Sequence, residues 1–169
     1  RRGLHLPAMS PSQVLVLGFI ALILAGTALL SLPVAGAGGR SVGFVNALFT
    51  ATSAVCVTGL VVLDTARDFS PFGQAVILAL IQVGGLGITI LSTLVALAVG
   101  RRVSLRERVV LQESLAHYGA GGVVRLVRTV VLVTMAIEGA GALVLFLRFL
   151  RDEPPVRALW LAIFHAVSA

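Results

Sequence analysis

Long stretches without a charged side chain are the feature that most limits what this chain can fold into. Residues 3–39, 41–63 and 69–100 contain no Asp, Glu, Lys or Arg. Only 12% of the 169 residues are charged, 58% are apolar, and the mean hydropathy is +1.05. Soluble domains average about 25% charged and about 45–50% apolar residues. The sequence therefore predicts a membrane protein.

Three apolar runs have the length of transmembrane helices, so we expect an all-α membrane protein. The first run, 13–32, has about 20 residues, which rise roughly 30 Å and match the thickness of a hydrocarbon core. The other two runs are 72–100 and 123–147. Glu138 lies near the middle of the last one and is a candidate intramembrane polar site, with either a structural or an ion-coupling role.

The distribution of arginines decides how a fourth apolar segment, 42–63, is interpreted. If 42–63 enters and leaves the membrane on one side, eight Arg collect on one face against Glu107 and Glu113, for a net charge of +6. The opposite face then has five Arg against four acids, for a net charge of +1. By the positive-inside rule the first face is cytoplasmic. The eight residues are Arg1, Arg2, Arg101, Arg102, Arg106, Arg108, Arg125 and Arg128.

The segment 42–63 is therefore predicted to be re-entrant from the outside. The N-terminus, 1–12, and a connector, 101–122, are then cytoplasmic. The fourteen residues from 42 to 55 would rise about 21 Å as a helix and reach the middle of the bilayer. Asn46, Thr50 and Ser53 are expected to support this short helix. Non-helical backbone at that depth must be buried in protein or line water, so the return limb should face a cavity or pore.

The return limb has the composition of an ion filter. Extended backbone with inward carbonyl groups can replace the hydration shell of a potassium ion. Val57, Thr58, Gly59 and Leu60 are the candidate carbonyl donors, with their side chains turned away into packing. Gly59 should adopt backbone angles that a side chain disfavours. Cys56 is expected to be a small buried residue.

The stretch from Thr52 to Leu60, entered from a short helix and followed by a full span, resembles a potassium-filter repeat. Together with Gln82-Val-Gly-Gly-Leu-Gly87 it is similar to the KtrB-type membrane subunits of the Trk/Ktr/HKT superfamily of cation transporters. The resemblance implies uptake of potassium, with sodium as a second transported ion, through a pore of four span–pore helix–filter–span repeats. Residues 13–100 match one repeat. Residues 123–169 resemble the start of a second, with a span, an external loop and a truncated pore helix that opens at Phe164–Ala169, so the chain is interpreted as an N-terminal fragment.

The resemblance also implies partners and a location. It places the protein in a bacterial plasma membrane as a multi-pass homodimer that binds a cytosolic nucleotide-binding ring of the KtrA/TrkA type. The Arg-rich stretch 101–128 could dock on that ring or contact anionic lipid. Nucleic acid is not an expected partner, because the arginines lie at the ends of apolar runs and no aromatic residues alternate with them.

Several other interpretations compete with these predictions. Gly84, Gly85 and Gly87 fit close helix packing, a hinge or a pore lining; a phosphate loop is not expected, because they lie in mid-span with no strand before them. The alternative function is a secondary transporter whose broken helix binds a small solute. An enzyme is not expected, since clustered acids, histidines and nucleophile partners are lacking. No organic cofactor and no metal other than the transported ion is predicted.

Overall fold

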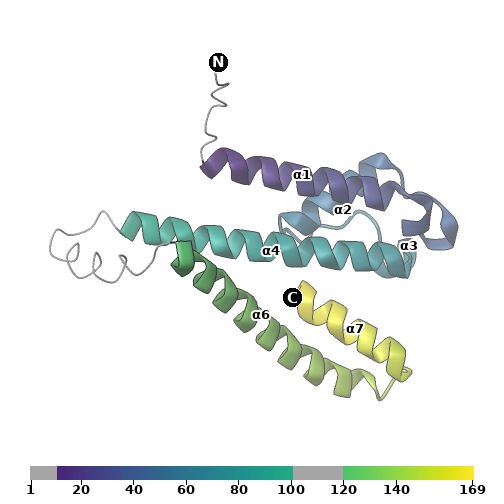
Figure 1. Ribbon diagram of the computed structural model, residues 1–169. Coiled ribbons are helices and arrows are strands. Elements are labelled where there is room, and N and C mark those ends of the chain that lie inside the picture. The colour runs from purple at the N-terminus through teal and green to yellow at the C-terminus, as the bar shows by residue number, and fades with distance from the viewer. Residues whose placement is uncertain (1–10, 101–119) are drawn as a thin grey trace. The chain divides into compact units, whose positions relative to one another are not determined.

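The computed structural model describes residues 11–100 and 120–169, which form helices joined by short irregular segments, without a strand (Figure 1). They fall into two compact units, Arg1–Gly84 and Gly85–Ala169. Among the described residues two helical stretches, Pro71–Ile90 and Val127–Phe149, are long and apolar enough to cross a membrane. The predicted all-α membrane class agrees with these helices.

The first unit contains three α-helices and the first part of a fourth, which differ widely in length. Helix α1 spans Pro11–Ser31 and stops before Pro33, whose ring is incompatible with a continuing helix. Two single-turn 3-10 helices, Pro33–Ala35 and Ala37–Gly39, lead to α2. Helix α2 is short, Phe44–Val55. After it come the single turn α3, Thr65–Asp68, and the long α4, Pro71–Gly100, which begins at a proline.

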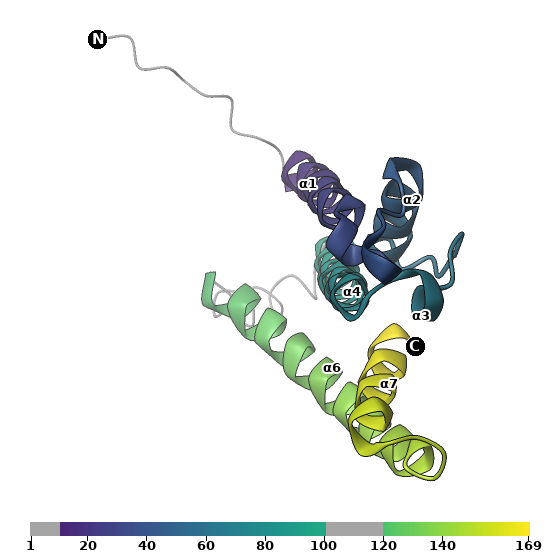
Figure 2. The same cartoon turned by 90° about the vertical axis from the view of Figure 1, so that its right-hand side faces the viewer.

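Small residues let α1, α2 and the first part of α4 pack closely (Figure 2). A Cβ added to Gly26 of α1 would lie 2.6 Å from Cδ1 of Leu80 on α4 and 3.3 Å from Cβ of Ala51 on α2. Leu80 and Ala51 are both buried. Close approach through glycine and alanine is the usual way in which membrane helices pack, because dispersion contacts replace the missing hydrophobic drive.

The loop after α1 is tied to the loop before α4. Gly36 and Phe69 form an isolated antiparallel bridge, and the Ser70 amide donates a hydrogen bond to the Ala35 carbonyl at 2.9 Å. The Ser70 hydroxyl donates to the Val34 carbonyl at 2.6 Å. The chain therefore leaves this loop through α2 and comes back to it before α4 begins.

The second unit contains a helical hairpin. Helix α6, Ala120–Phe149, packs on α7, Pro155–Ser168. The turn between them has two short-range ion pairs, Arg148–Asp152 at 2.5 Å and Arg157–Glu153 at 3.4 Å. The rings of Phe149 and His165 lie 5.6 Å apart between centroids and close the hairpin.

Two boundaries differ from the prediction. Helix α7 begins at Pro155, so the expectation that a pore helix opens at Phe164–Ala169 is wrong; this stretch is the carboxyl end of the helix. The reason is that Pro154 and Pro155 start the helix nine residues earlier, where a missing amide proton costs nothing. Helix α6 begins at Ala120, inside the connector expected over 101–122. The rest of that connector, with Arg101, Arg102, Arg106 and Arg108, and residues 1–10 of the expected N-terminus lie outside the described residues.

Candidate functional site

Helix α2 stops in the middle of an apolar stretch. It has 12 residues, which rise about 18 Å and are too few to cross a hydrocarbon core of about 30 Å. The chain then runs without helix from Val57 to Leu63, which we name the return segment. The return segment begins at the carboxyl end of α2, where the helix dipole presents its negative end.

A Schellman motif ends α2 and turns the chain. The Val57 amide donates to the Ala54 carbonyl at 3.3 Å, and the Thr58 amide donates to the Ser53 carbonyl at 3.1 Å. These are the two bonds of the motif, and Val57 occupies its left-handed position with a φ of 53°. Glycine usually fills that position, because a β-branched side chain is strained there by about 1–2 kcal/mol. The turn could not be predicted from the sequence, because valine is not a residue typical of turns.

Gly59 provides a second left-handed residue two positions later, with a φ of 71°. The positive φ expected at Gly59 is therefore present. An added Cβ would meet no heavy atom within 4 Å. The requirement for glycine at this position is thus conformational, not a matter of space.

Ser53 binds the return segment to α2. Its hydroxyl donates to the Leu60 carbonyl at 2.7 Å, and it accepts a hydrogen bond from the Thr58 hydroxyl at 3.0 Å. The Ser53 side chain is buried, and a buried hydroxyl is stabilising only when it is hydrogen-bonded. The bond directs the Leu60 carbonyl oxygen toward Ser53.

The other residues expected to support α2 act locally. The Asn46 amide nitrogen donates to the Val42 carbonyl at 2.9 Å, at the start of its own helix. Thr50 is half-buried on α2. Neither hydrogen-bonds to the return segment in the contacts described, so Ser53 differs from both.

Two expectations about side chains fail at this turn. Cys56 is exposed, so its predicted burial is wrong; it follows the last helical residue of α2 and its side chain lies outside the packing with α1 and α4. Val57 and Leu60 are 51% and 61% exposed. Their side chains therefore do not pack into the described part of the chain, although packing was expected.

Of the three predicted packing glycines Gly84, Gly85 and Gly87, Gly84 makes the tightest contact described. A Cβ added to Gly84 would lie 2.1 Å from the carbonyl oxygen of Val55, the last residue of α2. Gly85 and Gly87 are half-buried, and α4 is continuous through all three positions. Glu138 is half-buried on α6, in the second unit. Its structural and ion-coupling interpretations remain predictions.

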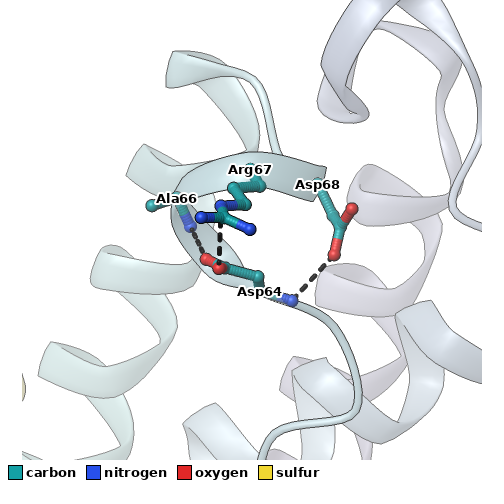
Figure 3. Close-up of polar contacts among 4 residues, drawn as sticks. All are labelled: Asp64, Ala66, Arg67 and Asp68. Atoms are coloured by element: carbon teal, nitrogen blue, oxygen red, sulfur yellow. Dashed lines mark hydrogen bonds and ion pairs between the residues drawn. The ribbon is translucent and has the colours of Figure 1, made fainter.

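Helix α3 closes the far end of the return segment (Figure 3). Asp64 caps the helix, because its Oδ1 accepts a hydrogen bond from the Ala66 amide at 2.9 Å. The Asp64 amide in turn donates to Oδ2 of Asp68 at 2.7 Å, and the Arg67 guanidinium lies 3.6 Å from Asp64. This local network fixes where the chain turns back toward α4.

Two short stretches of the sequence, one in each unit, are similar to each other. Ala47–Ala54 of α2 and Ala162–Ala169 at the end of the chain share Ala, Phe, Ala, Ser and Ala at five of eight positions. Gly141 and Ala166 lie 115 positions after Gly26 and Ala51, and both pairs are in contact: a Cβ on Gly141 would lie 3.8 Å from Cβ of Ala166. Ser168 lies 115 positions after Ser53, at the same spacing.

These features fit an all-α membrane protein in which long apolar helices pack around an interrupted one. Comparison with known proteins then gives the family. Residues 2–169 match the family model described as TrkH, cation transport protein, and the chain belongs to this family. Its members are potassium and other cation transport proteins and not enzymes.

Curated relatives agree with the family. The chain is 41% identical over 160 residues to Ktr system potassium uptake protein B of Bacillus subtilis, covering 95% of this chain and 36% of the relative. It is 40% identical over 161 residues to potassium/sodium uptake protein NtpJ of Enterococcus hirae, with shares of 95% and 36%. Identity to Ktr system potassium uptake protein B of Vibrio alginolyticus is 35% over 157 residues, with shares of 93% and 34%. The chain thus spans about a third of the length of these relatives.

Proposed function

We propose that the full-length protein containing this chain takes up potassium, with sodium as a second transported ion, through a membrane pore. This chain contributes one span–pore helix–filter–span repeat, residues 13–100, and the first part of another, residues 123–169. The relatives named as potassium and potassium/sodium uptake proteins support the choice of ions. The protein is proposed to be a multi-pass protein of the bacterial plasma membrane with a cytoplasmic N-terminus.

The interrupted helix α2 is the observation that carries this proposal. The helix stops at Val55, and the return segment leads back to a loop that is bridged to the end of α1 through Gly36 and Phe69. A segment that leaves and rejoins the same loop is expected to enter and leave the membrane on one side. It therefore supports a re-entrant pore helix, as the distribution of arginines requires.

The proposed ion ligands are the backbone carbonyls of Val57, Thr58 and Gly59. The Leu60 carbonyl accepts a hydrogen bond from Ser53, so we assign it to holding the return segment in place. The return segment lies at the carboxyl end of α2, and the negative end of a helix dipole favours a cation. A broken helix that binds an anionic solute would instead present its amino end, so the geometry favours a cation pore over the secondary-transporter alternative.

The second unit supports a repeated architecture. The contacts Gly26–Ala51 and Gly141–Ala166 recur at one spacing, and each joins a long helix to the shorter helix that follows it. In this proposal α7 is the second pore helix, and Ser168 has the place that Ser53 has in the first. Ser168 is the last residue of α7.

The proposed partners follow the family and the charge distribution. A homodimer in the lipid bilayer and a cytosolic nucleotide-binding regulatory ring are the proposed assembly. The Arg-rich stretch 101–128 is the surface proposed for the ring, and anionic lipid is the other partner that its charge would attract. No nucleic acid takes part in this proposal.

Substitution of Gly59 by Ser tests the function. Uptake of rubidium or potassium is measured in potassium-starved cells that express the full-length protein. Gly59→Ser should lower uptake about tenfold or more, because a side chain at this φ is strained by about 1–2 kcal/mol and shifts neighbouring carbonyls. Gly38→Ser is the matched control: Gly38 has a φ of 66°, has open space around its Cβ position, and lies in the loop after α1.

Wild-type uptake with loss only in Gly59→Ser supports the proposed filter. Equal uptake by wild type and Gly59→Ser would count against it. A wild-type protein that transports neither ion would contradict the proposed function as a whole.

A further inference from the structure

The contact between Gly84 and Val55 joins the long helix α4 to the point where α2 stops. A Cβ at position 84 would lie 2.1 Å from the Val55 carbonyl oxygen, 2.8 Å from its carbonyl carbon and 2.8 Å from its Cα. All three atoms are backbone, so no side-chain rotation could relieve the overlap. Gly84 and Val55 are both buried, and the Val55 side chain is fully enclosed.

We propose that Gly84 is a positioning residue for the ion filter. By admitting the Val55 backbone against α4, it sets the depth at which α2 ends and therefore where the carbonyls of the return segment lie. This inference rests on the proposed function, because it assigns ion discrimination to the return segment. It names a residue on another helix, 25 positions after Gly59, as a determinant of that discrimination.

The link from Val55 to the proposed ligands is short and rigid. Val57 is only two residues beyond Val55, and the amides of Cys56, Val57 and Thr58 are all hydrogen-bonded back to α2. The Ser53 hydroxyl then holds the Leu60 carbonyl at the other end of the ligand stretch. A displacement of the end of α2 should therefore move Val57, Thr58 and Gly59 with it, because these hydrogen bonds tie the turn to the helix.

The continuity of α4 distinguishes the proposed positioning role of Gly84 from that of a hinge. Helix α4 continues through Gly84, Gly85 and Gly87 to Gly100. Gly84 thus serves close contact with another backbone and not bending of its own helix. The same helix also offers a matched position: a Cβ at Gly73 would lie 2.2 Å from the Ala35 carbonyl oxygen, in the loop after α1.

The pair Gly84→Ala and Gly73→Ala tests the inference in the full-length protein. Both changes force one methyl group into a backbone carbonyl, but only the first carbonyl belongs to α2. Uptake of rubidium is measured with competing sodium, and rates are divided by the amount of protein in the membrane. Gly84→Ala should change the potassium-to-sodium preference by about fivefold, since discrimination depends on carbonyl placement. Gly73→Ala should lower the amount of protein and leave the preference as in the wild type.

An unchanged preference in Gly84→Ala, or an equal change in both variants, would overturn the inference while leaving the proposed function intact. If Gly84→Ala does not accumulate in the membrane, Val55→Ala provides the test of the inference. This change loosens the same contact between α2 and α4 by removing buried volume. Val55→Ala should also change the preference, and Leu30→Ala, which empties an equally buried site on α1, should not. A wild type without uptake would contradict the proposed function and not this contact.

Discussion

At the scale of the residue, the turn after α2 combines a strained backbone conformation at Val57 with hydrogen bonds that maintain this conformation. Val57 has a φ of 53°, an uncommon conformation for a β-branched residue. Strain of this kind persists only where surrounding contacts determine the backbone. Here the Schellman bonds and the Ser53 hydroxyl do so. The positive φ of Gly59 could be predicted from the sequence because glycine favours such a conformation. The positive φ of Val57 could not, because valine rarely adopts it.

Removal of the Ser53 hydroxyl should loosen the return segment. Ser53→Ala deletes the hydrogen bonds to Leu60 and Thr58, each worth about 0.5–1.5 kcal/mol. We expect a lower potassium-to-sodium preference in competition uptake by the full-length protein. Thr52→Ala is the control, because the exposed Thr52 hydroxyl donates to the Leu48 carbonyl of its own helix. An unchanged preference in Ser53→Ala would contradict the assigned role.

At the scale of the element, α2 is short although its sequence continues to be apolar. Cys56, Val57, Leu60, Val61 and Val62 contain no residue that breaks a helix, and Gly59 comes four residues after the helix has ended. The carboxyl end is instead fixed by two contacts, the Schellman bonds and the approach of Gly84 to Val55. The residue types along α2 therefore do not predict where this helix ends.

The left-handed conformation of Val57 predicts that glycine is more stabilising than alanine at this position. Val57→Gly should give a higher melting temperature in detergent than Val57→Ala, because alanine retains the left-handed penalty of about 1–2 kcal/mol and glycine does not. Comparison with alanine removes the contribution of the half-exposed valine side chain. A melting temperature of Val57→Gly below that of Val57→Ala would show that residue 57 is not left-handed in the assembled protein.

At the scale of the whole molecule, the proposed orientation depends on how many times the chain crosses the membrane. The loop after α1 and the loop before α4 are hydrogen-bonded to each other, so the segment between them begins and ends in one place. With α1 and α4 as crossings and α2 as a re-entrant helix, the arginines of the N-terminus and those of the stretch 101–128 would collect on one side. That arrangement is the one the positive-inside rule favours.

Thiol labelling of intact cells tests this orientation. In a full-length protein without native cysteines, an impermeant maleimide should label Ala37→Cys from outside, because residue 37 is exposed in the loop after α1. Ser104→Cys, in the Arg-rich connector, should be labelled only after the membrane is permeabilised. External labelling of Ser104→Cys would show that 42–63 crosses the membrane completely and would contradict the re-entrant proposal.

The sequence by itself determined the helical membrane class, the family, the long helices to within a few residues, and Gly59 as a residue of special conformation. These follow from properties that are local in the chain: charge-free runs, proline at helix ends, and glycine at a positive φ. Only the tertiary structure decided that Val57 is left-handed, that Ser53 holds Leu60 and that Gly84 meets Val55. Those features depend on which backbones come within van der Waals distance, and the residues of α2 and α4 that meet there, Val55 and Gly84, are 29 positions apart in the chain.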